Sequence, residues 1–279
     1  MDAPETITSP ANPRVRQAAR LRDAGERRQT GLTLVDGLRE LSRAAAAGVE
    51  IVEVFVVADP PPDAGRAAAL AACTAACAAC GAAVVPLGGR AFEKLAFGDR
   101  NEGLVGVVRF RPRSLADVSF AAGRPVLVAE GVEKPGNLGA ILRTADAAGL
   151  AGMINCDGRT DAANPAAIRA SLGTVFTVPL AAATAAETIR WAAAANRRVV
   201  AATPTAERAW HEAKLAGDTL LVVGSEADGL STAWHDAARA GTIHLETVCL
   251  PMRGVADSLN VAATAAIIAY EAVRQETSR

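Results

Sequence analysis

Residues 126–150 read VLVAEGVEKPGNLGAILRTADAAGL, and this stretch predicts a strand, a loop and a helix in succession. VLVAE (126–130) is apolar until its last residue, which is typical of a strand buried on both faces. The glycines and the proline that follow favour a tight loop. From residue 137 apolar residues recur at helical spacing until Gly149 ends the pattern. A buried strand that leads through a short loop into a helix is the repeating unit of a parallel α/β sheet.

The same alternation extends in both directions along the chain. Strands are expected at 32–35, 51–57, 82–85 and 103–108, and again at 126–130, 153–155, 174–178, 198–203, 219–224 and 242–250. Helices are expected at 37–47, 65–80, 89–96, 137–148, 164–172, 184–196, 206–215, 230–240 and 258–275. The segment 112–125, which contains proline and glycine, is typical of a linker. We therefore expect two α/β domains, 1–111 and 126–279, each with a parallel sheet covered by helices.

The composition limits the class of protein. With 279 residues, 51% hydrophobic residues and a net charge of −1, the chain can bury a core, which excludes a fully disordered protein. Its longest apolar runs are rich in alanine and shorter than the roughly 20 residues of a membrane span. Met1–Pro10 lacks the apolar stretch of a signal peptide. We expect a soluble, cytoplasmic protein without a membrane partner.

Five cysteines occur in the chain: Cys73, Cys77, Cys80, Cys156 and Cys249. They are expected to be reduced thiols, because nothing in the sequence indicates secretion. The first three stand at helical spacing, but no nearby histidine or fourth cysteine completes the four ligands that zinc prefers. We interpret these three as small buried helix residues, and we expect no metal.

Arginine is concentrated in the first 113 residues. Residues 12–30 hold six arginines against two acidic residues, a local charge of +4, and residues 90–113 hold six basic against three acidic residues, +3. Such stretches in a nearly neutral chain indicate a face for a polyanion, with an ordinary solvated surface as the alternative. The overall excess of arginine over lysine is weaker evidence, because a GC-rich genome also produces it. The candidate contacts are Arg14, Arg16, Arg20, Arg22, Arg27, Arg28 and Arg109.

Two loops of the second half carry unusual polar residues at strand ends, where ligands of parallel sheets bind. The loop after VLVAE contains Asn137, a candidate helix cap, and Arg143, which the apolar periodicity turns away from the core. In GSEADGLS (224–231) Glu226 follows a buried strand. A carboxylate there is costly unless a cation or a polar ligand faces it.

A third loop, 249–272, supplies apolar and polar residues together: Leu250, Pro251, Met252, Ser258, Leu259 and Asn260. With the glycines of the other two loops they suit a pocket for an adenine and an amino-acid tail. Simple helix caps at Asn137 and Ser258 and a core-filling Met252 are the alternative interpretation. Taken alone, the periodicity predicts a nucleotide-like ligand in an α/β domain, without identifying a reaction.

These stretches resemble the signature motifs of the SpoU/TrmH branch of the SPOUT-class RNA methyltransferases. The similar segments are PGNLGAILRTADAAG (135–149), NPAAIRASLGTVF (164–176), VVGSEADGLS (222–231) and LPMRGVADSLNVAATAAI (250–267). The resemblance covers 126–275. SPANPRVRQAARLR (9–22) and LTLVDGLREL (32–41) more faintly resemble the substrate-binding domain of this branch, which is similar to a small ribosomal-protein RNA-binding fold.

The resemblance implies transfer of a methyl group from S-adenosylmethionine to a ribose 2'-hydroxyl of RNA, a deep trefoil knot in the second domain and a homodimer. It places the catalytic roles on Arg143, Asn137, Glu226, Ser258 and Asn260, and the cofactor contacts on Thr203, Gly224, Glu226, Leu250, Met252, Ser258 and Leu259. By analogy with the branch, ribosomal RNA is expected rather than transfer RNA, and DNA is not expected. We expect Arg143 to stabilise a developing alkoxide, because guanidinium is effectively always protonated and makes a poor base.

The chain departs from the family pattern at Lys134, where aspartate or asparagine is usual, and at Ser225, where asparagine is common. Both departures bear on the choice of substrate. One rival interpretation is a Rossmann-type oxidoreductase with Asp157 about 20 residues after GNLG, but the G-x-G-x-x-G spacing is missing. A non-catalytic RNA-binding protein of the same fold is the other, and the intact motif residues argue against it.

Overall fold

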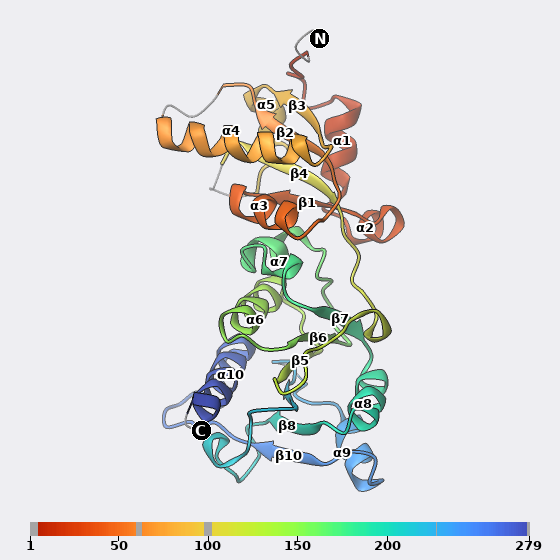
Figure 1. Cartoon of the computed structure of the whole chain (residues 1–279), viewed down its shortest axis with the longest axis vertical. Coiled ribbons are helices and arrows are strands. Elements are labelled where there is room, and N and C mark those ends of the chain that lie inside the picture. The colour runs from red at the N-terminus through yellow and green to blue at the C-terminus, as the bar shows by residue number, and fades with distance from the viewer. Residues whose placement is uncertain (1–4, 60–62, 98–101, 227, 278–279) are drawn as a thin grey trace. The chain divides into compact units, whose positions relative to one another are not determined.

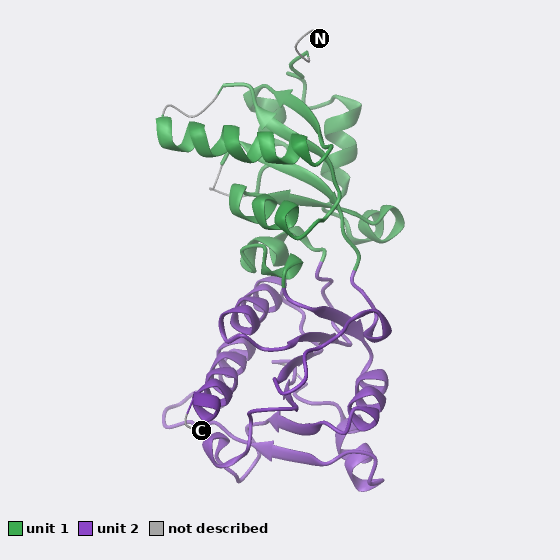
Figure 2. Cartoon of the chain, in the orientation of Figure 1, with its two compact units in different colours: residues 1–111, 163–177 green, residues 112–162, 178–279 purple. Residues whose placement is uncertain are grey.

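A computed structural model describes residues 5–59, 63–97, 102–226 and 228–277 of the chain. The chain divides into two compact units (Figures 1 and 2): Met1–Arg111 with Ala163–Thr177, and Pro112–Ala162 with Val178–Arg279. Each unit has its own sheet flanked by helices, so the expected α/β class is confirmed. The segment 163–177, which the sequence analysis placed in the second domain, groups with the first unit.

The first unit is built on a four-stranded sheet in the order β1-β4-β2-β3. Its strands are β1 (Leu32–Asp36), β2 (Ile51–Val57), β3 (Ala83–Leu87) and β4 (Leu104–Arg109). β2 and β3 are parallel, but β4 is antiparallel to both β1 and β2. The expectation of a parallel sheet is therefore wrong for this unit. The reason is that a strand buried on both faces has the same apolar run whichever way its neighbours point.

Helices cover both faces of this sheet. They are α1 (Pro13–Arg20), α2 (Ala24–Thr30), α3 (Leu38–Ala46), α4 (Ala64–Ala79), α5 (Gly89–Glu93) and α7 (Pro165–Ala170). One face packs Val15 of α1 and Phe92 of α5 against Phe55 of the sheet. The other face receives α3, whose Leu41 lies 2.4 Å from the position that a Cβ on Gly106 would take. The absence of a side chain at Gly106 lets α3 lie close to the sheet.

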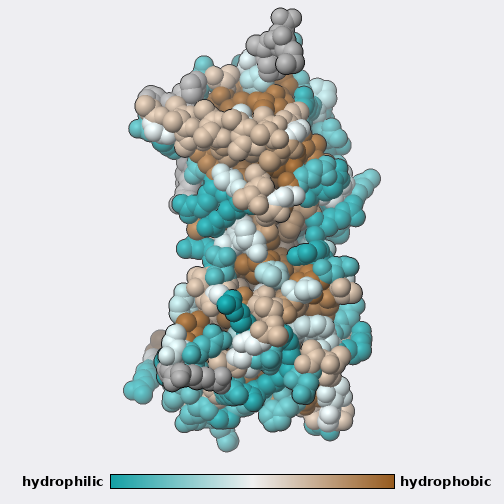
Figure 3. Space-filling model, in the orientation of Figure 1, coloured by the Kyte–Doolittle hydropathy of each residue, from teal (hydrophilic) through white to brown (hydrophobic). Residues whose placement is uncertain are grey.

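The alanine-rich helix α4 lies on the surface of the first unit, and its alanines form the pale brown band across the upper part of Figure 3. Cys73 and Cys77 face the core and are buried, as expected, whereas Cys80 is exposed. The expectation of burial is wrong for Cys80 because the helix ends at Ala79. A hydrogen bond with Cys77 lowers the pKa of the Cys73 thiol below its usual value.

Side-chain contacts hold the segment 163–177 in the first unit. The Thr33 hydroxyl donates to the Ala163 carbonyl at 2.6 Å, and Arg169 forms an ion pair with the buried Asp36 at 2.9 Å. Arg43 donates to the Leu172 carbonyl at 2.7 Å. These contacts come from strand β1 and helix α3, so the segment extends the first unit although it lies between two strands of the second in sequence.

The strand expected at 174–178 is wrong. Residues Thr174–Phe176 form a short 3₁₀ helix, and strand β7 follows at Leu180–Ala183. The hydroxyls of Ser171 and Thr174 donate to backbone carbonyls three residues earlier. Gly173 adopts a left-handed conformation with φ of 82°. Such local hydrogen bonds compete with strand pairing, so the apolar residues here do not form a strand.

The second unit contains a six-stranded, wholly parallel sheet in the order β10-β8-β9-β5-β6-β7. Besides β7 its strands are β5 (Val126–Glu130), β6 (Gly152–Cys156), β8 (Arg198–Ala202), β9 (Thr219–Val223) and β10 (Leu245–Val248). The chain runs outward from β5 to β7 and then returns to the other side of β5, where β9 pairs with it. The direction of winding therefore reverses between β5 and β9, which is where parallel sheets bind ligands.

Helices flank this sheet on both sides (Figure 1): α6 (Pro135–Ala147) and α10 (Val261–Thr277) pack together on one face, and α8 (Ala185–Ala194) and α9 (Thr232–Arg239) on the other. The helix expected at 206–215 is reduced to a 3₁₀ turn at Trp210–Glu212. Within the described residues, no helix has the length and apolar character needed to cross a membrane.

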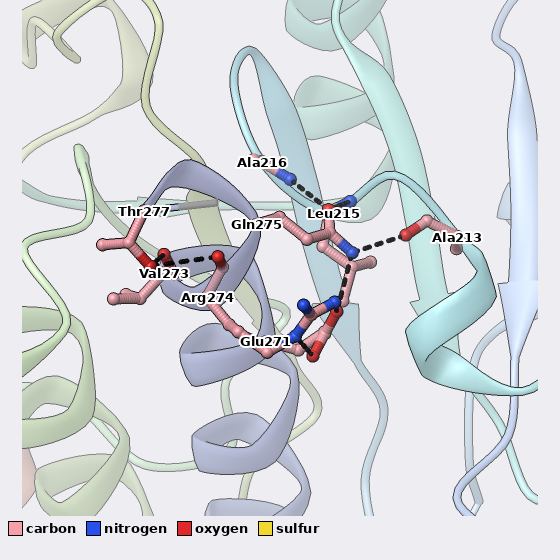
Figure 4. A network of polar contacts seen from close by, with 8 residues as sticks. All are labelled: Ala213, Leu215, Ala216, Glu271, Val273, Arg274, Gln275 and Thr277. Carbon is pink, nitrogen blue, oxygen red and sulfur yellow. Dashed lines mark hydrogen bonds and ion pairs between the residues drawn. The ribbon is translucent and has the colours of Figure 1, made fainter. Parts of the chain in front are cut away.

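Gln275 anchors the end of α10 to the segment that precedes β9 (Figure 4). Its side-chain oxygen accepts from the backbone N–H of Leu215 at 2.8 Å and of Ala216 at 3.3 Å. Its side-chain nitrogen donates to the Ala213 carbonyl at 2.8 Å and to Glu271 at 2.9 Å. One amide thus satisfies three backbone groups that no regular element pairs, and it fixes the helix that begins beside the strand ends.

Candidate active site

Three loops of the second unit come together at the carboxyl ends of β5 and β9. The loop after β5 leads into α6, the turn 225–229 follows β9, and the third loop leads into α10. The turn is closed by two backbone hydrogen bonds between Ser225 and Gly229, at 3.0 and 3.1 Å. A Cβ on Gly224 would lie 2.3 Å from the Gly229 carbonyl carbon and oxygen, so only glycine fits there. This tight turn presents the Glu226 side chain to the other two loops.

The Glu226 carboxylate is the meeting point of the site. Its Oε1 accepts from the side-chain amides of Asn137 at 3.0 Å and of Asn260 at 2.7 Å, and its Oε2 lies 3.1 Å from the Lys134 ammonium. Asn260 also donates to the Asn137 side-chain oxygen at 3.2 Å. The hydrogen bond from Lys134 is the main cause that holds the pKa of Glu226 below its usual range. Glu226 is therefore an anion at neutral pH and accepts hydrogen bonds rather than protons.

Two of the expected helix caps are wrong. Asn137 lies inside the first turn of α6, which begins at Pro135, and its side chain points to Glu226 instead of capping the helix. The helix expected from Ser258 begins at Val261, and Asn260 caps it by accepting from the Ala262 N–H at 3.0 Å. Asn260 thus starts α10 with its oxygen and holds Glu226 with its nitrogen.

Arg143 stands apart from this cluster. It lies on α6 six residues beyond Asn137 and therefore about 240° further around the helix. Its side chain is exposed, and within the part of the chain that the structure describes it has no hydrogen bond or ion pair. The structure therefore joins Asn137, Glu226 and Asn260 but leaves the Arg143 guanidinium open to a ligand.

A cavity of about 510 Å³ adjoins the cluster. All seven expected cofactor contacts line it: Thr203, Gly224, Glu226, Leu250, Met252, Ser258 and Leu259. Its volume lies in the range of small-molecule sites, and its wall combines apolar residues with a few polar groups. The cavity is also lined by Asp228 and Asp257, which were not predicted from the sequence. Both stand in the motif stretches, and only their place beside the cavity distinguishes them from other surface acids.

A smaller cavity of about 240 Å³ lies beside the first and shares Ser225, Glu226 and Val261 with it. Its remaining wall comes from the loop after β5 and includes Glu133, Lys134 and Asn137. Lys134, which departs from the family pattern, therefore contributes to the small cavity and not to the large one.

The arginines of the first unit that were expected to contact RNA differ in exposure and in whether they already have protein partners. Arg27 is buried and donates to the Leu21 and Arg22 carbonyls, so it stabilises a turn and is wrongly placed on an exposed face. Arg22 lies over the Phe97 ring and donates to two carbonyls. Arg14 and Arg109 pair with Glu53 and Glu50. The side chains of Arg16, Arg20 and Arg28 are exposed and form no ion pair within the described ranges. Of the basic stretch 90–113, Arg100 lies outside the described residues.

One group of side chains carries atoms that could bind a metal ion, but its two carboxylates already accept hydrogen bonds from the starts of two helices. Ligand atoms of Glu130, Cys156 and Asp157 lie within 4.8 Å of one another. The N–H and hydroxyl of Ser231 donate to Glu130 at 3.0 and 2.6 Å, and the Ala185 N–H donates to Asp157 at 2.8 Å. Both carboxylates therefore hold the starts of α9 and α8.

Comparisons with known proteins identify the family of the chain. Residues 124–270 match the model of the SpoU rRNA methylase family, and residues 12–106 match that of the MRM3-like substrate binding domain. The 23S rRNA (guanosine-2'-O-)-methyltransferase RlmB of Salmonella typhi is 31% identical over 201 residues, which are 70% of this chain and 80% of RlmB.

Solved structures are similar to nearly the whole chain. The crystal structure of an RNA 2'-O ribose methyltransferase has a TM-score of 0.83 at 36% identity, covering 98% of this chain and 100% of that one. An AdoMet-bound rRNA methyltransferase from Sinorhizobium meliloti has a TM-score of 0.82 at 29% identity, covering 97% and 98%. By its motifs, its site and the family model that spans its second half, the chain belongs to the SpoU rRNA methylase family.

Proposed function

We propose that this protein transfers a methyl group from S-adenosylmethionine to a ribose 2'-hydroxyl of large-subunit ribosomal RNA. The observation that carries the proposal is the 510 Å³ cavity, which gathers all seven expected cofactor contacts beside the Glu226 cluster. Family membership and the similarity to RlmB, named for 23S rRNA, support the ribosomal substrate. The AdoMet-bound relative supports the cofactor.

The cavity residues match the chemistry of S-adenosylmethionine. Leu250, Met252 and Leu259 offer apolar surface to an adenine, and Thr203 offers a hydroxyl. Asp257 offers a carboxylate to the ammonium group of the amino-acid tail. The bound cofactor supplies an electrophilic methyl group on a sulfonium sulfur.

The chain's own residues prepare the nucleophile. A ribose hydroxyl attacks well only once its proton is leaving, and the exposed Arg143 guanidinium stabilises the alkoxide that develops. Guanidinium does not accept the proton, so the proton passes to an RNA phosphate or to water. Asn137, Ser258 and Asn260 orient the ribose and the loops around it.

The homodimer and the trefoil knot belong to the same proposal, since the family resemblance implies both. Ile267 and Tyr270 on α10 are 37% and 51% exposed, and they lie three residues apart on one side of the helix. A second copy of this chain is the occupant we assign to this apolar face. Substitution of Tyr270 by aspartate should convert a dimer to a monomer in sedimentation.

For RNA binding we propose the exposed Arg16, Arg20 and Arg28, with Arg14, Arg22 and Arg109 able to exchange their protein partners for phosphates. We propose the cytoplasm as the place of the reaction, since ribosomal RNA is the proposed substrate. Transfer RNA is the alternative substrate.

The test incubates the protein with methyl-labelled S-adenosylmethionine and unmodified 23S rRNA or bulk tRNA, followed by digestion to nucleosides. We expect a labelled 2'-O-methyl nucleoside from 23S rRNA, and label from tRNA alone would reassign the substrate. Absence of transfer together with absence of cofactor binding would overturn the proposal.

A further inference from the structure

A fourth loop of the second unit reaches the site, and its residues lie outside the family motifs. It follows β6, and its Arg159 side chain pairs with Glu133 through one nitrogen and with Asp228 through another, the latter at 2.8 Å. Glu133 belongs to the loop that leads to Asn137, and Asp228 belongs to the turn that presents Glu226. A single guanidinium therefore bridges the two loops whose side chains meet at Glu226.

The backbone that carries Arg159 is itself fixed. The N–H groups of Arg159 and Thr160 both donate to the Val132 carbonyl, at 3.2 and 3.3 Å. The buried Asn155 side chain donates to the Thr160 carbonyl at 3.1 Å. A Cβ on Gly158 would lie 2.2 Å from the Asn155 side-chain oxygen, so the loop closes tightly over that amide. Arg159 thus projects from a rigid loop, as a residue that positions others must.

We propose that Arg159 is a positioning residue of the methyl transfer, which holds the turn 225–229 against the loop that carries Asn137. The inference rests on the proposed function. Asp228 lines the large cavity and Glu133 lines the small one, so the bridge spans the wall between them. The planar guanidinium presents its donors in a fixed fork, so it bonds two carboxylates in fixed directions, whereas the three donors of an ammonium rotate about a single nitrogen.

Arg239 provides a matched control. It forms an ion pair with Asp236 in the same unit, with side chains 76% and 57% exposed, compared with 56% for Arg159 and 51% and 65% for its partners. Exposed pairs of this kind contribute little to stability. Both Arg159→Ala and Arg239→Ala should therefore unfold at the same denaturant concentration as the unmodified protein.

The two variants should differ at the site. We expect Arg159→Ala to lower kcat by about fivefold to tenfold and to weaken S-adenosylmethionine binding by about threefold, on the scale of two lost exposed ion pairs. Arg239→Ala should change neither. Arg159→Lys should recover only part of the loss, because a single ammonium nitrogen lacks the planar fork that fixes the directions of both bonds. Glu133→Gln combined with Asp228→Asn should reproduce the loss, and adding Arg159→Ala to that pair should cost nothing more.

Hydrogen exchange of the Gly229 amide separates this inference from the proposed function, because it needs no substrate. The amide closes the turn by donating to the Ser225 carbonyl, and it should exchange several times faster in Arg159→Ala than in Arg239→Ala. Equal exchange in the two variants, or equal kcat, overturns the positioning role. If the unmodified protein neither binds S-adenosylmethionine nor transfers methyl, the proposed function fails and the inference fails with it.

Discussion

Removal of the Glu226 carboxylate is the most direct test of how the site is held together. Asn137 and Asn260 donate to it at 3.0 and 2.7 Å, and Lys134 lies 3.1 Å away. In Glu226→Ala these donors lose their shared acceptor, so the loops before α6 and α10 lose their link to the turn 225–229. We expect the fold to remain, because the side chain is partly exposed and lies outside the core.

The magnitude follows from the contacts. A net hydrogen bond contributes about 0.5–1.5 kcal/mol, and we take about 1 kcal/mol for each amide because the Glu226 side chain is 32% exposed. The Lys134 side chain is 71% exposed, so its ion pair adds at most about 0.5 kcal/mol. The sum is about 2.5 kcal/mol. If all of this free energy is lost from stabilisation of the transition state, kcat/KM falls by about 70-fold. Glu226→Gln keeps one acceptor oxygen and should lose about tenfold.

The assay measures methyl transfer to 23S rRNA together with S-adenosylmethionine affinity by calorimetry. Glu207→Ala, which removes an exposed glutamate that lines neither cavity, is the matched control. Because the folded pKa of Glu226 is lowered, its contribution is complete above the ordinary glutamate range and is lost only as the pH falls through the lower folded value. The ratio of wild-type to Glu226→Gln activity should therefore stay constant between about pH 8 and about pH 5. Wild-type kcat/KM in a folded Glu226→Ala variant would refute the reasoning.

Three further changes test other contacts. Arg143→Ala should abolish methyl transfer and leave S-adenosylmethionine affinity within about twofold, whereas Arg143→Lys should keep partial activity. If calorimetry shows that Arg143→Ala loses cofactor affinity as strongly as it loses activity, Arg143 is a structural residue. Gln275→Ala leaves the N–H groups of Leu215 and Ala216 without their acceptor and should lower the free energy of unfolding by about 2–3 kcal/mol in urea titrations. An unchanged urea midpoint would contradict the anchor role of Gln275. Arg169→Ala leaves the buried Asp36 carboxylate without its cation and should destabilise the first unit by about 2–4 kcal/mol at neutral pH. Burial raises the folded pKa of Asp36, so this loss should grow as the pH rises through that value, and a pH-independent loss would exclude the mechanism.

Much of the fold follows from apolar patterning. The strand expected at 126–130 is observed at the same residues, and the strand expected at 219–224 is observed one residue shorter, at Thr219–Val223; both are short apolar runs followed by glycine. The pattern does not report strand direction, which is why the antiparallel β4 was not expected. It also fails at 174–178, where Ser171 and Thr174 bond to their own backbone and form a 3₁₀ turn. Residues 163–177 look like part of the second domain because chain order does not reveal that Asp36 pairs with Arg169.

The sequence predicted those site residues that directly follow a buried strand. Glu226 stood out because a carboxylate beyond a buried strand needs partners, and the structure supplies Asn137, Asn260 and Lys134. The choice among partners was not predictable, since it depends on how three loops meet in space. Arg159 gave no sequence signal for the same reason: its partners lie 26 residues before it and 69 residues after it.

The contacts of the carboxylates also restrict how the proton can leave the ribose. Among the described carboxylates that line the two cavities, Glu226 is held by amides and an ammonium, and Glu133 and Asp228 are held by Arg159. Asp257 also lines the large cavity, and we have assigned its carboxylate to the ammonium group of the cofactor. A carboxylate that already accepts several charged or amide donors is a weak base, because each donor favours its ionised form. In the proposed mechanism, a cationic Arg143 close to an RNA phosphate lowers the free-energy cost of the alkoxide while the proton moves to a phosphate oxygen or to water. We therefore propose that the site stabilises charge and that the RNA or water, rather than a protein carboxylate, accepts the proton.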